Sequence, residues 1–370
     1  MKIALFATTL AITSTFAFCN ARKSSDQDSS SDGKSNTRRG KKKNSQNSEG
    51  FLKSIPMDGS VAEAAKDTFW LCPNSNLEAY MYTMTGGPRA SWVKDGNIVD
   101  IKKIPLIDAK VTMENEFCVD TSATQRRMHG NGIPNHKIGT FPIPKDDPAY
   151  PYYAGHLDPF GCYDAAEIPV FGYTLDITVP RFPTYNEEPT CIGALTMGIA
   201  TANGAPWHLE YATISGNPYP NDPATLLPYD ACFGHPVNGI YHLHGKSWTC
   251  FPDQGPNNRH SPLFGFALDG FGIYGPKSEH GKLVTNKDLD ECHGHIHEIM
   301  WEGKKVPMYH YHLNREYPYS IGCFRGTPVK LIENISSCIA SDINVTSVNT
   351  LTEENPKTTC LGANRKVTKE

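Results

Sequence analysis

The sequence lacks a second long apolar run and lacks the common hydrolase and phosphate-binding signatures. After the apolar stretch at residues 3–18, no segment approaches the ~20 apolar residues that a membrane-spanning helix needs. Gly-x-Ser-x-Gly, His-Glu-x-x-His and glycine-rich phosphate loops are all absent. The sequence therefore predicts no spanning helix and none of these three kinds of active site.

The first 21 residues have the layout of a secretory signal peptide. Lys2 provides the positive start, residues 3–18 provide the apolar core, and Ala17, Cys19 and Ala21 are small residues near a cleavage point. We therefore expect a secreted, extracellular protein.

Apolar side chains are almost missing from residues 22–50, where eight Lys and Arg stand against four Asp and Glu. Such a segment cannot bury enough apolar surface to offset its ordering entropy, so we predict a disordered basic segment. The basic run at 38–43 has three interpretations: a solvated tail, a propeptide cleavage site, or a patch for anionic polymer or mineral. From residue 51 onward 26 basic residues face 35 acidic ones, which argues against nucleic acid as a partner.

Frequent glycine (31) and proline (28), with 10% aromatic residues, favour a turn-rich, mainly β chain. The predicted fold class is a disulfide-stapled, antiparallel β-sandwich-like domain with an internal duplication, preceded by the disordered basic tail. The predicted divisions are a signal peptide (1–21), a disordered segment (22–50), an N-terminal β-rich extension (51–125), a main domain (126–330) and a glycosylated C-terminal tail (331–370).

Several local elements can be predicted within these divisions. Residues 61–68 favour a short helix, and Asp95-Gly96 between apolar flanks indicates a hairpin. Residues 170–179 and 191–201 have the pattern of strands, and Asn203-Gly204 forms a tight turn after the second. The tail carries two glycosylation sequons, at Asn334 and Asn344.

Eleven cysteines are present, and Cys19 falls at the predicted cleavage point. Ten remain, an even number in an oxidising compartment, so we expect disulfides rather than metal ligands. One of these disulfides is expected to hold the C-terminal tail in place as a covering segment. The ten are Cys72, Cys118, Cys162, Cys191, Cys232, Cys250, Cys292, Cys323, Cys338 and Cys360.

The chain repeats one pattern, at residues 198–251 and again at 265–324. Each copy has Gly-x-Ala, an Asn-Gly or Asp-Gly turn, Asp-x-Cys-x-Gly-His, Tyr-His-x-His and Cys-Phe, in that order. The pattern predicts a duplication about a pseudo-twofold axis. It also predicts one disulfide in each copy, Cys232–Cys250 and Cys292–Cys323.

Histidines carry the candidate chemistry, since ten of the 14 lie between residues 235 and 312. In a strand, Tyr-His-x-His places both histidines on one face. We predict that the two strands meet near the pseudo-twofold axis and that their imidazoles converge on one metal ion, copper or zinc. The candidate ligands are His242, His244, His310 and His312, joined by His235 and His295.

Other readings of these residues stay open. The tyrosines and histidines could form a hydrogen-bonded polar network without a metal, or Asp269 or Glu298 could replace one imidazole. Asp269 also suits a hairpin turn, whereas Asp230 and Asp290 either cap turns or orient a ligating histidine. The motif tyrosines are expected in the core on the opposite strand face: Tyr241, Tyr309 and Tyr311.

The motifs of residues 131–330 resemble those of the YHYH-domain proteins. They include Asn-Gly-Ile-Pro-Asn-His at 131–136, His-Ser-Pro-Leu at 260–263 and Cys-Phe-Arg-Gly-Thr-Pro at 323–328. The family takes its name from a Tyr-His-Tyr-His motif. The first copy departs from it and reads Tyr-His-Leu-His at 241–244, although both histidines are kept. The resemblance implies an exported domain more than a function, and with this layout it points to extracellular matrices, including mineralised ones.

Three functions of different classes follow. The first is a non-catalytic secreted glycoprotein of an extracellular matrix, such as the organic matrix of a shell or skeleton, which binds a metal at its histidines and contacts a matrix polymer or mineral surface. The second is a secreted copper- or zinc-dependent enzyme with an open coordination position. The third is a β module that binds carbohydrate or protein through a His/Tyr groove. We favour the first, and the sequence leaves the oligomeric state open.

Overall fold

The computed structural model describes residues 102–153, 169–210, 227–335 and 339–361, with short stretches at 62–63, 83–84, 92–94, 98–100, 213–214 and 223. All of them belong to one compact unit, Ser48–Glu370. The predicted signal peptide and basic segment lie outside the described residues, as do Cys72, Cys162 and Cys338. Strands dominate the described part, which confirms the mainly β prediction; its one α-helix is the single turn α2 (Tyr150–Tyr153).

An eight-stranded sheet contains both copies of the repeat. Its order is β13-β14-β10-β9-β15-β16-β18-β17. The first copy supplies β9 (Thr196–Ile199), β10 (Pro206–His208), β13 (Gly234–Val237) and β14 (Ile240–Leu243). The second supplies β15 (Leu263–Ala267), β16 (Gly272–Tyr274), β17 (Gly294–Trp301) and β18 (Lys304–His312).

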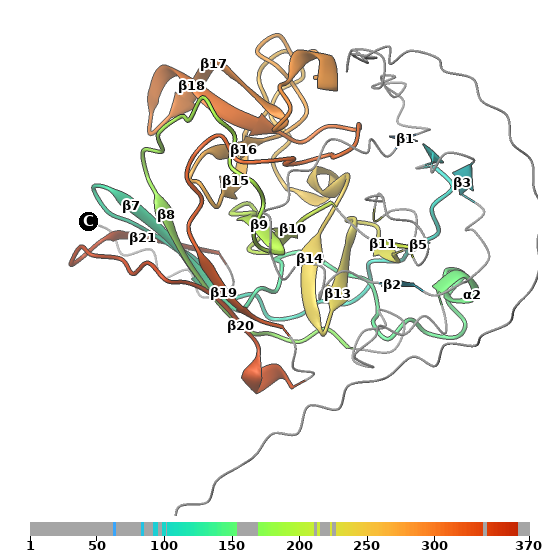
Figure 1. Cartoon of the computed structure of the whole chain (residues 1–370). Helices are drawn as coiled ribbons and strands as arrows, with labels where there is room; N and C mark the ends of the chain where they lie inside the picture. The colour runs from blue at the N-terminus through green and yellow to red at the C-terminus, as the bar shows by residue number, and fades with distance from the viewer. Residues whose placement is uncertain are drawn as a thin grey trace, which may run out of the picture. The chain divides into compact units, whose positions relative to one another are not determined.

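The two halves of this sheet are related by a pseudo-twofold axis between β9 and β15, as the repeat predicts. These strands pair antiparallel, with Phe266 opposite Ile199. On either side, β10 pairs parallel with β14 and β16 pairs parallel with β18. In Figure 1 the yellow β13–β14 hairpin and the orange β17–β18 hairpin lie at opposite ends, with the other four strands between them.

A six-stranded sheet forms the second large layer of strands, in the order β19-β20-β8-β7-β6-β21. It consists of β6 (Phe117–Thr121), β7 (Gln125–Gly130), β8 (Thr174–Pro180), β19 (Leu331–Asn334), β20 (Asn344–Ser347) and β21 (Lys357–Leu361). Most pairs in both sheets run antiparallel, as predicted, but β20 pairs parallel with β8. The sequon residues Asn334 and Asn344 are paired across β19 and β20 and are half-buried.

The hairpin turns of the eight-stranded sheet pack against the six-stranded sheet. A Cβ atom added at Gly204 would lie 3.0 Å from the Phe117 side chain of β6. One added at Gly270, the matching turn residue, would lie 2.4 Å from the Pro180 carbonyl of β8. Both glycines have positive φ, of 90° and 91°. Asn-Gly and Asp-Gly are thus required for the turn and for the close approach.

Short strands join the N-terminal region to the main domain. β1 (Ala62–Glu63) and β3 (Val93–Lys94) flank β4 (Ile98–Val99), while β2 (Thr83–Met84) pairs with β11 (Thr213–Ile214) and β5 (Leu106–Ile107) with β12 (Tyr229–Asp230). β3 pairs antiparallel with β4, which agrees with the predicted hairpin, and the turn residues Asp95 and Gly96 lie outside the described residues. The predicted helix at 61–68 is wrong at 62–63, because β1 pairs there with β4.

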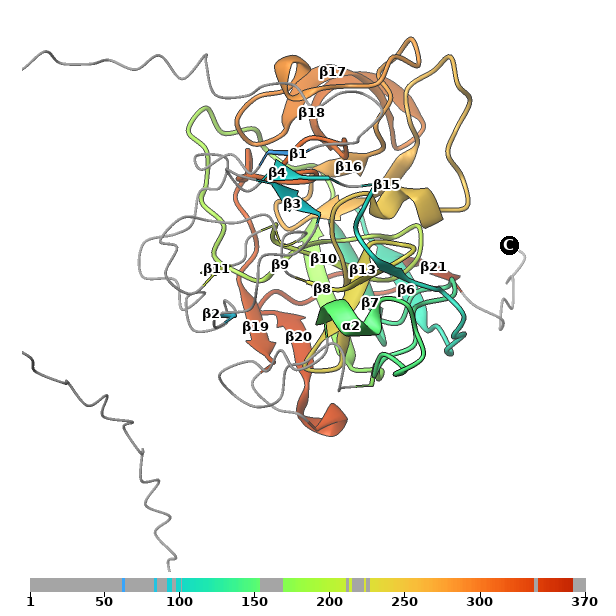
Figure 2. The ribbon, with the colours of Figure 1, turned by 90° about the vertical axis from the view of Figure 1, so that its right-hand side faces the viewer.

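The chain boundaries inferred from composition cut across these sheets. The β6–β7 hairpin spans the division at 125/126 (Figure 2), and β19 to β21 of the tail complete the six-stranded sheet. Composition shows where the usage of residue types changes along the chain, whereas strand pairing depends on partners that can be hundreds of residues away. Among the described helices, none is long and apolar enough to cross a membrane.

Three disulfides join described cysteines. Cys232–Cys250 and Cys292–Cys323 close one loop in each repeat, as predicted. Cys118–Cys360 ties β6 to β21, so the C-terminal staple holds a sheet strand in place. Cys191 is also disulfide-bonded.

Candidate metal centres

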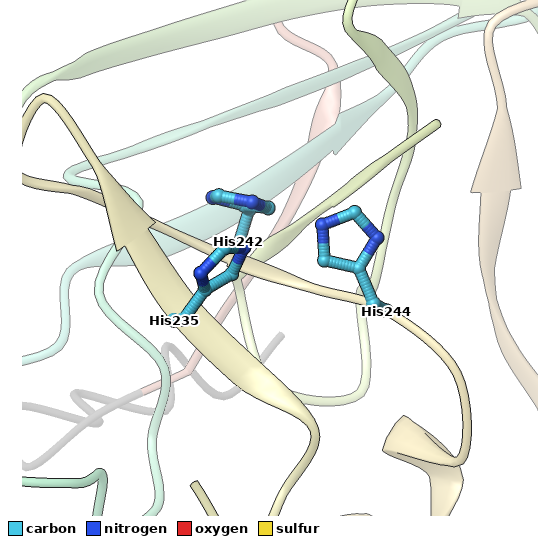
Figure 3. A group of neighbouring side chains, drawn as sticks. All are labelled: His235, His242 and His244. Carbon is cyan, nitrogen blue, oxygen red and sulfur yellow. The ribbon is translucent and has the colours of Figure 1, made fainter. Parts of the chain in front are cut away.

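The first histidine cluster, which we call the first centre, comprises His235, His242 and His244. His242 and the residue after β14, His244, lie two positions apart, and His235 is paired with His242 across the β13–β14 hairpin. Figure 3 shows the three imidazoles gathered between these segments. One nitrogen from each lies within 4.8 Å of the others, and all three residues are buried. The first repeat therefore supplies three metal-ligating groups to one point.

Hydrogen bonds orient two of these rings by their Nδ1 atoms. His242 Nδ1 lies 3.0 Å from the Ile240 carbonyl oxygen, and His244 Nδ1 lies 3.1 Å from Glu210 Oε2. A backbone carbonyl only accepts, so Nδ1 of His242 carries the proton and its Nε2 is the atom with a free lone pair. A carboxylate behind a histidine is a frequent arrangement at metal sites, where it raises the basicity of the ligand.

A fourth imidazole covers the first centre. The His208 ring stacks on His242 with centroids 3.8 Å apart, and His208 is buried. Burial lowers the pKa of His208, His235 and His242 well below the ordinary value, and that of His244 to about 3. Burial also raises the pKa of Glu210. The imidazoles are therefore neutral near pH 7, which is the form that binds metal.

The second centre comprises His260, His310 and His312. The last two lie on one face of β18, and His260 precedes β15. His310 Nε2 is 3.1 Å from both His260 Nε2 and His312 Nε2. In a tetrahedral zinc site with bonds of 2.0–2.1 Å, the ligand nitrogens are about 3.3 Å apart. These two distances fit nitrogens that share one small transition-metal ion.

The protons of this cluster lie on the far side of each ring. The Nδ1 atoms of His260, His310 and His312 lie 2.8 Å, 3.0 Å and 2.6 Å from backbone carbonyl oxygens, those of Ser261, Met308 and Gly275. A carbonyl only accepts, so each Nδ1 is the donor and each Nε2 presents a lone pair to its neighbours. Three lone pairs at this distance repel one another unless a cation or a proton lies between them.

His295 lies beside the second centre at the position that His235 holds in the first. Its ring centroid is 4.8 Å from that of His310 and 5.0 Å from that of His312. Its Nδ1 lies 3.1 Å from the Asp288 carbonyl, and its buried Nε2 has no hydrogen-bond partner among the described residues. His295 thus offers a fourth lone pair.

The predicted convergence of His242, His244, His310 and His312 on one ion is wrong. Four strands separate β14 from β18 in the sheet. At 4.7–4.9 Å per strand the two pairs are about 24 Å apart. The axis passes between β9 and β15, and each Tyr-His-x-His strand lies far from it, so each repeat builds its own centre.

The predicted supporting carboxylates serve the tyrosines and the turns. Asp230 Oδ1 accepts from the amides of Cys232 and Gly234, and Asp290 Oδ1 accepts from the corresponding two amides. Tyr241 and Tyr309 donate to these aspartates at 2.9 Å, and Tyr311 donates to Asp269 at 2.6 Å. The three tyrosines are buried on the face opposite the histidines.

Neither alternative acidic ligand lies in a centre. Asp269 accepts from the backbone amides of Phe271 and Gly326, at 3.1 Å and 2.9 Å, and so stabilises its hairpin turn. The side chain of Glu298 is 53% exposed and pairs with Lys305. The geometry therefore supports imidazole-only ligand sets.

Sequence reasoning missed three residues of these sites: His208, Glu210 and His260. His208 ends β10, the second strand of the first hairpin of the repeat, and Glu210 lies two residues further on. Their position after the Asn203-Gly204 turn of the repeat was the signal that the sequence offered. His260 stands before β15 in the His-Ser-Pro-Leu motif, which already belonged to the family pattern. None of the three lies in the His-x-His pattern, so only the fold brings them to the centres.

Neither the curated proteins nor the solved structures contain a match to this chain. A family model matches part of the chain, from within β8 to a point after β16, so the match includes the first Tyr-His-x-His motif and stops before the second. This model, described as YHYH protein, matches residues 176–283, which confirms the resemblance to the YHYH family over that part of the chain.

Proposed function

We propose that this chain is a secreted, non-catalytic matrix glycoprotein that binds two transition-metal ions, zinc or copper(II), one in each repeat. The observation that carries the proposal is the second centre, where three Nε2 atoms lie 3.1 Å from their neighbours and all three Nδ1 atoms face carbonyls. Neutral imidazole suits both metals.

A purely structural polar network accounts for the centres less well. In such a network each buried lone pair faces a donor. In the second centre the backbone carbonyls accept from each Nδ1, and the remaining Nε2 atoms face one another. A metal ion removes that repulsion and supplies bonds to nitrogens that are buried away from water.

The matrix part of the proposal is supported by charge and by covalent bracing. The acidic balance from residue 51 onward and the basic segment before it suit contact with mineral or charged polymer. The disulfides suit an oxidising extracellular compartment.

The test is the metal content of protein purified without a histidine tag. We expect two ions per chain by elemental analysis. Chelation should lower the free energy of unfolding by about 3 kcal/mol for each ion that was present at a hundredfold over its Kd. The double variant His310→Ala, His312→Ala should hold one ion, and the matched variant His242→Ala, His244→Ala should also hold one. Protein that neither contains metal nor gains stability from added zinc or copper would disprove the proposal.

A copper- or zinc-dependent enzyme is the second candidate, and one observation favours it. His260 of the second centre and the neighbouring His295 are only half-buried, so that centre is not closed by protein on every side. Catalytic zinc sites share this feature, since they hold three protein ligands and leave one position for water or substrate.

A further inference from the structure

The first centre is closed by protein. His235, His242 and His244 are 0%, 2% and 3% exposed. His208 covers one ring by stacking, and the buried ring of Tyr229 lies 5.3 Å from His235 and 5.6 Å from His244. Glu210 is buried behind His244. A metal ion here would reach solvent only if this packing opened.

The second centre is closed on one side only. His310 and His312 are fully buried, but His260 and His295 are half-buried. Next to them lies His297, whose ring is parallel to that of His260 at 6.5 Å and whose side chain is 31% exposed. His297 Nε2 lies 3.3 Å from Glu279, which is 40% exposed. A row of imidazoles, with one carboxylate at its outer end, thus runs from the surface to the second centre.

One exchange between the repeats accounts for part of this difference. Trp207 pairs with Leu243 in the first repeat and Ile273 pairs with Tyr311 in the second, so Tyr274 stands where the first repeat has His208. The Tyr274 ring is T-shaped to the rings of His260 and His310, with centroid distances of 5.0 Å and 5.1 Å. Its hydroxyl donates to the Met300 carbonyl, so it adds no metal ligand.

From this asymmetry we infer that the ion in the second centre binds a small exogenous monodentate ligand, such as water, hydroxide or azide, on the side of His295 and His297, and that the ion in the first centre does not. The inference rests on the proposed metal binding. It gives the two centres different roles, since a closed site stabilises the fold and an open one can bind and polarise a ligand.

The test uses full-length protein loaded with cobalt(II) and titrated with sodium azide, followed by visible absorption. We expect a saturable spectral change in the wild type. The variant His242→Ala, His244→Ala should keep the whole change, whereas His310→Ala, His312→Ala should lose it while still holding one cobalt ion. The milder variant His260→Ala, which removes a half-buried ligand, covers the case in which the double variant does not fold; it should weaken or abolish the response.

Other outcomes overturn the inference in distinguishable ways. Two bound cobalt ions with no azide response would show that both centres are closed. A response that survives in His310→Ala, His312→Ala and disappears in His242→Ala, His244→Ala would assign the open position to the first centre. Protein that binds no cobalt, zinc or copper would remove the proposed function itself, and the inference with it.

Discussion

At the residue scale, the histidines and the tyrosines of Tyr-His-x-His have different roles. The histidines of each motif face a candidate metal centre, while the tyrosines point to the opposite face, where Tyr241 donates to the buried Asp230 and Tyr309 to the half-buried Asp290. Tyr311 and the Gly326 amide both donate to Asp269 Oδ2, which joins the strand to the Cys-Phe-Arg-Gly segment. The motif therefore couples each centre to the core through aspartates that its spacing does not reveal.

Asp269 predicts a pH dependence of stability. Burial raises its pKa from 3.8 to about 6. A raised carboxyl pKa means that the folded state holds a proton that the unfolded state has released, so the contribution is present below pH ~4 and is lost as pH rises through 6. The lost stability is about 3 kcal/mol for this shift.

The measurement compares urea unfolding of the wild type and Asp269→Asn between pH 4 and 7. The asparagine does not titrate, so the wild-type advantage should shrink by about 3 kcal/mol as pH rises across this range. A difference in stability that stays constant, or that grows with pH, would contradict the raised pKa of Asp269 in the folded protein.

At the element scale, two equivalent glycines lie where the two copies of the repeat meet. Gly198 and Gly265 hold the same position in β9 and β15, next to the pseudo-twofold axis. A Cβ at Gly198 would lie 2.7 Å from the Phe266 carbonyl oxygen, and one at Gly265 would lie 2.1 Å from that of Ile199. Each strand thus needs a glycine so that the other can approach, and the Gly-x-Ala of the repeat marks the joint between halves.

Gly265→Ala should therefore disrupt the β9–β15 pair. The new Cβ meets backbone, which cannot rotate away, so we expect a loss of about 3 kcal/mol or more in the free energy of unfolding. Gly172→Ala is the matched control, because a Cβ there meets its nearest atom at 3.5 Å, an ordinary contact. Equal stability of the two variants in denaturant titrations would show that the joint tolerates a side chain.

The same scale shows how much of the fold was predictable. The repeat, both of its disulfides and the Asn-Gly and Asp-Gly turns rest on residues close together in sequence, and all are present. Six candidate ligands could be named because His-x-His and Gly-His are local patterns. Their division into two centres could not, since it depends on four intervening strands.

At the scale of the whole molecule, Arg126 links the two large sheets. It lies on β7 of the six-stranded sheet, and its guanidinium pairs with Glu302 of the β17–β18 turn. The guanidinium carbon is 3.8 Å from the centroid of the Phe266 ring on β15. The Arg126 side chain is 5% exposed, so this contact is shielded from water.

Arg126→Ala should cost about 3 kcal/mol or more of stability, because it removes a buried cation and its packing and leaves Glu302 with one partner. Arg181→Ala is the control, since Arg181 pairs with the same carboxylate but is 25% exposed. A loss below about 1 kcal/mol is expected there. Thermal unfolding of both variants tests the difference, and equal losses would argue against Arg126 as the link.

The limits of local pattern are clearest at the histidines. Periodicity and repetition place two imidazoles on one face of each motif strand, because strand geometry depends on neighbouring residues alone. The addition of His260 and His208, the stacking that closes one centre and the half-burial that opens the other depend on segments that meet only when the sheets assemble. The kinds of ligand were thus readable from the chain, whereas the number of centres and their access to solvent follow from non-local strand order and packing.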